Sequence, residues 1–246
     1  MKTRHGKLIL LPTPLSADGF GHLPQNLPEI LDGIDEFIVE NERTARRFLI
    51  KAGISRHPDE FVFHLLNKFT EAVDLDAMHK ELEGGKTLGL VSEAGLPAIA
   101  DPGSDVIARA QSAHIPVVPV AGPSSIFMAL MASGFNGQRF RFRGYLPIEK
   151  DKRKKTIAHL EDESSKRNET QIFIETPFRN NHMLKDILDI CAPETLLCLA
   201  TNITAGNESI QTRSIAQWKK NTPDFHKKPT VFLIMKRNPR DHKRRK

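Results

Sequence analysis

The chain has 246 residues, which is enough for one large domain or two of ordinary size. Hydrophobic residues make up 39% and charged residues 27%, a globular balance without the long apolar runs of a membrane-spanning protein. The net charge of +6 is concentrated at the end of the chain, where residues 236–246 hold seven basic side chains and one acidic one. Such a tail can hold RNA phosphates or simply stay solvated, and the sequence leaves both open.

The sequence predicts neither a disulfide nor a metal site. Its two cysteines, Cys191 and Cys198, fall on different predicted elements, and its ten histidines form no pair at ligand spacing. The apolar run over 8–11 ends at Pro12 and is too short for a signal peptide. We therefore expect a cytoplasmic protein without a metal ion.

Strands and helices alternate through the first half of the chain. Apolar runs predict strands at 7–11, 36–39, 87–91 and 116–120. Helices are expected at 27–31, 44–52, 74–83, 105–113 and 124–133. This alternation implies a parallel sheet with right-handed crossovers. The stretch 55–73 has no clear pattern.

The alternation breaks around Gly134 and Gly137, where we place a domain boundary. In the second half, strands are expected at 140–144, 171–175, 195–201 and 230–235, and helices at 152–163, 180–191 and 214–219. We predict an N-terminal α/β domain over 1–136, a C-terminal α/β domain with a mixed sheet over 137–237, and a basic tail over 238–246.

Ligands of open α/β sheets bind beyond the carboxyl ends of the strands, so the loops after the strands are the candidate sites. The loop after the first strand contains Gly19 and Gly21, but Pro24 stands where a dinucleotide-binding motif needs its third glycine. Its two prolines, Pro12 and Pro14, make a stiff loop with fewer N–H donors.

The loop over 92–103 is the most informative stretch, since its small residues allow close approach of a ligand and its prolines fix its shape. We expect Glu93, at a strand end, to point toward a ligand, whereas Asp101 is explained as a turn or cap residue. A tight turn over 121–125 follows the next strand. In the second half, Glu175 and Arg179 could clamp a substrate or pair with each other.

These loops carry a family resemblance. The segments are Leu-Pro-Thr-Pro-Leu at 11–15, Glu-Asn-Glu-Arg at 40–43, Ser-Glu-Ala-Gly-Leu-Pro-Ala-Ile-Ala-Asp-Pro-Gly at 92–103, Ala-Gly-Pro-Ser-Ser at 121–125, Arg-Gly-Tyr-Leu-Pro at 143–147 and Glu-Thr-Pro-Phe-Arg at 175–179. In this order they resemble the tetrapyrrole-methylase superfamily, and within it the small-subunit ribosomal RNA cytidine 2′-O-methyltransferases. The resemblance covers about residues 8–235, and its specific part is the segment 92–103.

The resemblance implies two α/β domains, usually in a homodimer, with S-adenosyl-L-methionine in a cleft between the domains. It implies that small-subunit ribosomal RNA is the partner. The residues expected at the methyl donor are Pro14, Ser92, Glu93, Ala94, Gly95, Pro97, Gly122, Pro123, Ser124, Thr204, Pro229 and Thr230. The candidates for substrate contact are Arg43, Arg179, Lys152 and Arg153, although a solvated helix face also explains the two last.

The sequence departs from the family pattern in several loops. The family typically has Glu-Asp-Thr-Arg at 40–43, Ser-Asp-Ala-Gly-Thr-Pro at 92–97, and His where this chain has Phe178. A Glu-Leu-Thr-Lys segment appears here as Thr-Asn-Ile-Thr-Ala over 201–205, without its charge pair. The donor-facing loops match better than the substrate loops of the second domain.

A ribose hydroxyl is a poor nucleophile that benefits from a general base. Glu93, Glu40 and Glu175 are the candidates, and the sequence does not choose among them. The leading hypothesis is a methyltransferase that acts on a ribose 2′-hydroxyl of small-subunit ribosomal RNA. The alternatives are a methyltransferase for a tetrapyrrole-like small molecule and a non-catalytic RNA-binding relative.

Overall fold

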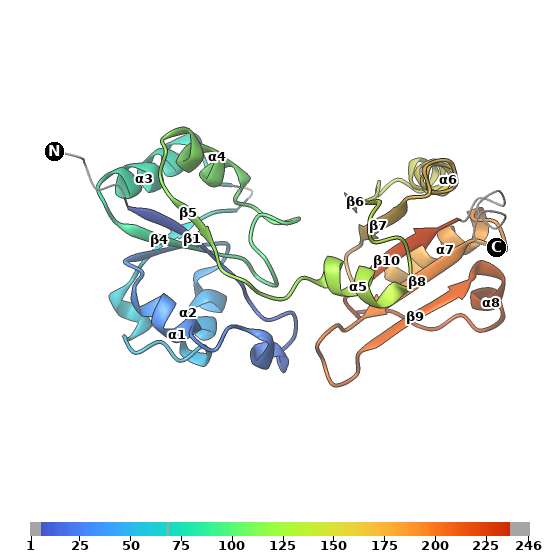
Figure 1. Ribbon diagram of the computed structural model, residues 1–246, viewed down its shortest axis with the longest axis horizontal. Helices are drawn as coiled ribbons and strands as arrows, with labels where there is room; N and C mark the ends of the chain where they lie inside the picture. The colour runs from blue at the N-terminus through green and yellow to red at the C-terminus, as the bar shows by residue number, and fades with distance from the viewer. Residues whose placement is uncertain (1–5, 68, 237–246) are drawn as a thin grey trace. The chain divides into compact units, whose positions relative to one another are not determined.

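The computed structural model describes residues 6–67 and 69–236. The chain divides into two compact units, unit 1 over Met1–Ser124 and unit 2 over Ser125–Lys246. Each unit has its own five-stranded sheet and its own hydrophobic core (Figure 1).

Unit 1 is a parallel α/β unit with strand order β3-β2-β4-β1-β5. Its strands are β1 (Lys7–Leu11), β2 (Glu36–Val39), β3 (Val62–Leu65), β4 (Thr87–Val91) and β5 (Val117–Pro119). Its helices are α1 (Leu27–Asp32), α2 (Glu42–Lys51), α3 (Ala72–Glu83) and α4 (Ser104–Ser112), with short 3-10 turns η1 (Gly19–His22) and η2 (Pro58–Glu60).

The helices of unit 1 cover both faces of its sheet (Figure 1). One core cluster joins Leu31 of α1 and Leu49 of α2 to Leu11 of β1, and the other joins Leu82 of α3 and Ala110 of α4 to the sheet. Burial on both faces explains why the central strands appear in the sequence as continuous apolar runs.

Unit 2 has a mixed sheet with strand order β6-β7-β10-β8-β9, in which only β6 and β7 pair in parallel. Its strands are β6 (Phe140–Tyr145), β7 (Thr170–Ile174), β8 (Leu196–Thr201), β9 (Ser209–Ser214) and β10 (Thr230–Met235). Its helices are α5 (Ser125–Ser133), α6 (Lys150–Arg167), α7 (Asn180–Ile190) and α8 (Ile215–Lys220). Trp218 lies in the core of this unit, where its indole N–H donates to the carbonyl of Leu197 at 2.9 Å.

The contacts divide the chain after Ser124, whereas the sequence predicted a domain boundary after residue 136. Helix α5 belongs to unit 2, because it packs against β8, β9 and β10. The hydroxyl of Thr212 on β9 also donates to the carbonyl of Ser133 at 2.8 Å. Glycines near residue 134 end the helix but do not separate the units.

Two strands were not predicted. Strand β3 lies within the stretch that had no clear pattern, and β9 follows β8 as an antiparallel edge strand. Helix α6 extends from Lys150 to Arg167, past both ends of the expected helix. Lys236, the residue after β10, pairs with Glu161 and Glu194, and the predicted basic tail over 238–246 lies outside the described residues.

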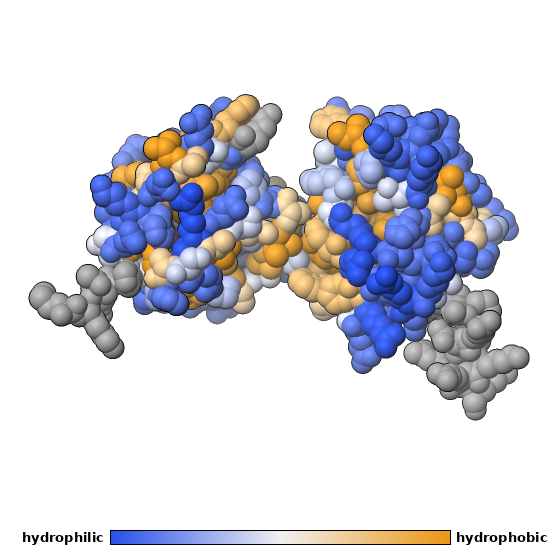
Figure 2. All heavy atoms as spheres, turned by 90° about the horizontal axis from the view of Figure 1, so that it is seen from above, coloured by the Kyte–Doolittle hydropathy of each residue, from blue (hydrophilic) through white to orange (hydrophobic). Residues whose placement is uncertain are grey.

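Each unit buries apolar clusters in its interior, although some large apolar side chains, such as Met131 and Ile148, are exposed. Hydrophilic side chains dominate the visible face of each unit, with smaller apolar patches between them (Figure 2). Among the residues in the described ranges, no helix is long and apolar enough to cross a membrane.

Candidate functional site

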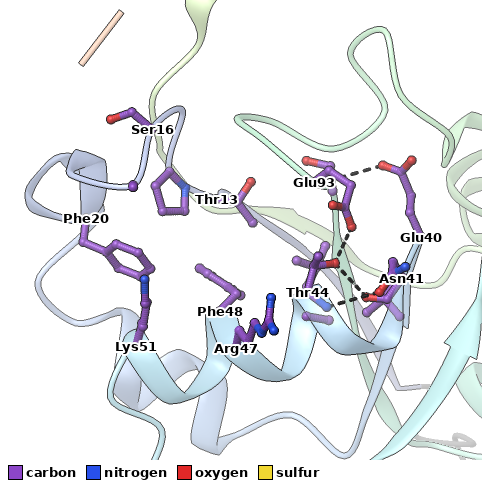
Figure 3. Close-up of a pocket in the computed structure, with 16 residues that line it drawn as sticks. Thr13, Ser16, Phe20, Glu40, Asn41, Thr44, Arg47, Phe48, Lys51 and Glu93 are labelled. Carbon is purple, nitrogen blue, oxygen red and sulfur yellow. Dashed lines mark hydrogen bonds between the residues drawn. The ribbon is translucent and has the colours of Figure 1, made fainter. Parts of the chain in front are cut away.

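The site in unit 1 lies where β1, β2 and β4 end, because parallel strands place their carboxyl ends at the same edge of a sheet. A pocket of about 370 Å³ is found there. Its lining comes from the loop after β1, the start and body of α2, and the loop after β4: Thr13, Pro14, Ser16, Ala17, Phe20, Val39, Glu40, Asn41, Thr44, Ala45, Arg47, Phe48, Lys51, Val91, Ser92 and Glu93. Figure 3 shows how these side chains face the pocket.

The loops after β1 and β4 are held together by their backbones. The N–H of Thr13 donates to the carbonyl of Gly95 at 2.8 Å, and the N–H of Gly95 donates back to the carbonyl of Thr13 at 3.2 Å. Gly95 has a φ of +81°, which favours glycine, and a Cβ there would lie 3.1 Å from Leu15. The two loops therefore form one rigid rim.

The turn after β5 joins this rim through close packing. A Cβ added to Gly122 would lie 2.1 Å from the Cβ of Pro12, so only glycine fits there. The carbonyl of Pro123 lies beside Gly95. The structure thus brings together the donor-loop residues that the sequence predicted in unit 1, from Pro14 through Gly95 to Pro123.

Three carboxyl groups gather near one end of the pocket. The hydroxyl of Thr44 donates to Oε1 of Glu93 at 2.5 Å, and the N–H of Glu93 donates to Oε1 of Glu40 at 3.4 Å (Figure 3). Burial raises the pKa of Glu40, and the charge of Glu93 raises it further. Burial, with the charges of Glu40 and Glu93, raises the pKa of Asp101 to about 6.

Ser92 is a buried polar residue of the pocket that has no protein partner. Its side chain is 5% exposed, and its Oγ forms no hydrogen bond within the described residues. A buried hydroxyl without a partner loses free energy unless a ligand satisfies it. Ser92 therefore indicates that a polar ligand group belongs beside the loop after β4.

The other end of the pocket is aromatic and basic. The rings of Phe20 and Phe48 stack with centroids 6.3 Å apart, and the ammonium group of Lys51 lies 5.8 Å from the centre of the Phe20 ring. Arg47, four residues before Lys51 on α2, also lines the pocket and is drawn between Phe48 and Thr44 (Figure 3). The pocket therefore has acidic groups at one end and basic groups at the other.

Unit 2 has a second loop cluster at one edge of its sheet. Because β10 is antiparallel to both β7 and β8, its start lies beside their ends. The N–H of Asn202 donates to the carbonyl of Pro229 at 2.9 Å, and the hydroxyls of Thr201 and Thr230 lie 3.1 Å apart. Thr204, Pro229 and Thr230, which the sequence predicted at the donor, are thus placed at this edge.

Glu175 and Arg179 also lie at this edge and pair with each other, as one of the two predicted alternatives had it. The guanidinium Nη2 of Arg179 lies 2.5 Å from Oε1 of Glu175, and the N–H of Thr176 donates to the same oxygen at 2.6 Å. The Glu175 side chain is only 1% exposed. Its engagement makes it a weaker candidate for a general base than Glu40 or Glu93.

Arg153, one of the residues predicted to contact substrate, is buried and paired within unit 2. Arg153 is 7% exposed, its Nη2 lies 2.6 Å from Oδ2 of Asp186, and its Nη1 donates to the carbonyl of Ile148 at 2.6 Å. It joins α6 to α7 inside unit 2. Lys152 is exposed and pairs with Glu149 at 2.7 Å, and Arg43 is exposed on α2 beside the pocket.

Sequence reasoning did not find Thr44, Phe20 and Phe48 as residues of the site, and it assigned Asp101 to a turn. Phe48 follows Thr44 by four residues on α2, so the helical period could have placed both on one side of the helix. Among residues 6–67 and 69–236, no group of three or more His, Cys, Asp or Glu side chains is arranged to hold a metal ion.

The fold of two α/β units is similar to the folds of several solved methyltransferase structures. The methyltransferase CobJ has a TM-score of 0.61 at 14% identity over 94% of both chains. The cobalt precorrin-4 methyltransferase CbiF has a TM-score of 0.56 at 12% identity, over 93% of this chain and 94% of its own.

Sequence comparisons give the family. Residues 25–218 match the model of the Tetrapyrrole (Corrin/Porphyrin) Methylases. "Ribosomal RNA small subunit methyltransferase I" of Vibrio cholerae serotype O1 is 32% identical over 92% of this chain and 76% of its own length. The protein of the same name from Xylella fastidiosa is 32% identical over 86% and 73%. The chain belongs to the tetrapyrrole methylase family and is a methyltransferase, which confirms the resemblance found in the loop motifs. That its ligand lies in a cleft between the two domains stays a prediction.

Proposed function

We propose that this methyltransferase transfers a methyl group from S-adenosyl-L-methionine to a ribose 2′-hydroxyl of small-subunit ribosomal RNA. The observation that carries the proposal is the 32% identity, over 92% of the chain, with a protein named for methylation of that RNA. The carboxylate-lined pocket of unit 1 supports it, since a hydroxyl acceptor needs a group that takes its proton.

The loops of the rim fit the methyl donor. The unpartnered Oγ of Ser92 offers a hydrogen bond to a polar group of the donor, and Gly95 and Gly122 let the loops of the rim pack closely against one another. We assign donor contacts to Pro14, Ser92, Glu93, Ala94, Gly95, Pro97, Gly122, Pro123 and Ser124 in unit 1, and to Thr204, Pro229 and Thr230 in unit 2. Arg43, Arg179 and Lys152 are assigned to RNA.

When bound, S-adenosylmethionine would supply an activated methyl group on a sulfonium sulfur. The sulfur would keep the electron pair of the C–S bond, and the methyl carbon would form a C–O bond to the acceptor oxygen. The protein's task is to orient the acceptor, exclude water and accept one proton. We assign Glu93 as the group that accepts the proton of the acceptor hydroxyl, because its carboxylate lines the pocket and is held by the hydroxyl of Thr44. Glu40 beside it has a raised pKa and is the alternative acceptor.

The experiment is transfer of labelled methyl from S-adenosylmethionine to small-subunit RNA that lacks its native methylations. We expect label at a ribose, and we expect Glu93→Gln to lower the rate of transfer. Label in a porphyrinoid but not in RNA would replace the proposal with small-molecule methylation. Absence of transfer to either acceptor would contradict methylation of RNA and favour a non-catalytic RNA-binding role.

The family resemblance also implies a homodimer in the cytoplasm, and we include both in the proposal. Analytical ultracentrifugation of the full chain tests the first point, since a stable homodimer sediments at twice the mass of the chain. A monomer at micromolar concentration would contradict it.

A further inference from the structure

We propose that the pocket of unit 1 is the subsite for the acceptor nucleotide of the RNA, with the base against Phe20 and Phe48, a phosphate at Arg47 and Lys51, and the ribose toward Thr44 and Glu93. The inference rests on the proposed function and deepens it. It assigns a role to Phe20 and to the residues of α2 that line the pocket opposite the loop after β4.

The size of the pocket suits one nucleotide. Its volume of about 370 Å³ lies at the lower end of the range of small-molecule sites, roughly 300–1,000 Å³. A duplex does not enter such a space, so the acceptor nucleotide enters it unpaired or flipped out of a stack, as in other enzymes that modify nucleic acids.

The aromatic wall supplies a surface for a base. Phe20 is partly exposed at the pocket, and its ring is held by stacking on Phe48, which is anchored in the core of unit 1. Bases stack on aromatic side chains without strong dependence on sequence. The wall therefore holds a base in place while other parts of the protein select the site on the RNA.

The basic end supplies charge for a phosphate. Arg47 and Lys51 are both exposed on α2, one helical turn apart, and within the described residues neither forms an ion pair with a carboxylate. Their neighbour Arg46 differs, because it pairs with Glu42 and Asp59. Two cations without carboxylate partners at the mouth of a pocket favour an anionic ligand.

The remaining wall places this subsite beside the donor loops. Thr13, Pro14, Ser92 and Glu93 line the pocket and also belong to the rim assigned to the methyl donor. Glu93 stands at that shared wall, with Thr44 bound to it. A nucleotide whose phosphate is at Lys51 and Arg47 thus directs its sugar toward the carboxylate that takes the proton.

The test uses charge reversal on the full-length protein, with Arg47→Glu and Lys51→Glu as separate variants. Lys80→Glu on α3 is the matched control, because Lys80 is exposed on the same unit and does not line the pocket. Steady-state methylation of unmethylated small-subunit RNA gives KM and kcat, and calorimetry gives the Kd for S-adenosylmethionine. Circular dichroism melting checks that each variant is folded.

We expect each pocket variant to raise the KM for RNA about tenfold, with kcat and the donor Kd within about twofold of the wild-type values. Phe20→Leu, which keeps an apolar side chain but removes the ring, should raise the KM roughly fivefold or more. Lys80→Glu should leave all three constants unchanged.

Two outcomes overturn the inference while the proposed function stands. One is an unchanged KM for RNA in the pocket variants, and the other is a parallel loss of donor affinity, which would make the pocket part of the donor site. Failure of the wild-type protein to methylate RNA would instead overturn the proposed function, and this inference with it.

Discussion

The hydroxyl of Thr44 on α2 donates a 2.5 Å hydrogen bond to the carboxylate of Glu93 in the loop after β4 (Figure 3). Asn41 prepares this contact, since its side chain caps α2 by accepting from the N–H groups of Arg43 and Thr44. The helix start is thereby fixed at the residue that holds Glu93.

Thr44→Val should lower kcat for RNA methylation about tenfold, because Glu93 loses the donor that orients it. It should cost only about 1 kcal/mol of unfolding free energy, the usual value of one hydrogen bond. Thr44→Ser keeps the hydroxyl and serves as the control, with kcat near that of the wild type. Equal kcat values for the Thr44→Val and Thr44→Ser variants would contradict an orienting role for Thr44.

Asp101 should make unit 1 less stable as the pH rises. Its pKa is raised from 3.8 to about 6 in the fold, so the folded state binds the extra proton. The stabilisation is complete below pH 4 and is lost as the pH rises through 6. Asp101→Asn should remove this loss and stabilise the protein at pH 8 by about 1 kcal/mol, after allowance for solvent screening. Urea unfolding at pH 4.5 and pH 8, followed by circular dichroism, measures it. A stability difference between Asp101→Asn and the wild type that is the same at both pH values would contradict the raised pKa.

Gly122→Ala should weaken binding of S-adenosylmethionine. A Cβ would overlap Pro12, so the turn after β5 or the loop after β1 must move, and the rim moves with it. We expect the donor Kd to rise at least tenfold and unit 1 to lose about 2 kcal/mol of stability. Gly137→Ala is the control, since a Cβ there meets no atom within 4 Å. Calorimetric titration with the donor checks both, and unaltered affinity in Gly122→Ala would count against the rim as the donor site.

Arg153→Met should destabilise the protein without a specific effect on RNA. Removal of the guanidinium leaves the buried carboxylate of Asp186 without its main partner, which typically costs about 3–5 kcal/mol. Lys154, 3.8 Å from Oδ1 of Asp186, should reduce this loss. The thermal midpoint should fall, while the KM for RNA of the folded fraction should match that of wild type. A normal midpoint with a raised KM would instead support contact between Arg153 and the substrate.

Much of the fold could be predicted because the buried strands have distinctive sequences. Strands β1, β2, β4 and β10 have the predicted bounds, and each consists mainly of apolar residues that are largely buried. Strand β9 was missed because Ser209–Ser214 is a polar edge strand, which pairs only with β8. Its existence depends on a partner strand that the local sequence does not reveal.

The loops of the rim could be found in the sequence, whereas the side-chain contacts that line the pocket could not. Proline and glycine mark the rim in the sequence, because they fix backbone shape locally. The contact between Thr44 and Glu93 joins two segments far apart in the chain, so no local pattern contains it. Arg153 could not be told apart from its neighbours in the sequence, because residues 152–155 are all basic. Its burial depends on the ion pair with Asp186, which lies on another helix.

The position of Trp218 decides what intrinsic fluorescence can measure. It is the only tryptophan of the chain, and the only tyrosine is Tyr145, so both chromophores belong to unit 2. Unit 1, with the pocket and the rim, has only phenylalanine. Emission from Trp218 therefore reports the melting of one half of the molecule, and comparison with circular dichroism can reveal whether the two halves unfold in one step or two.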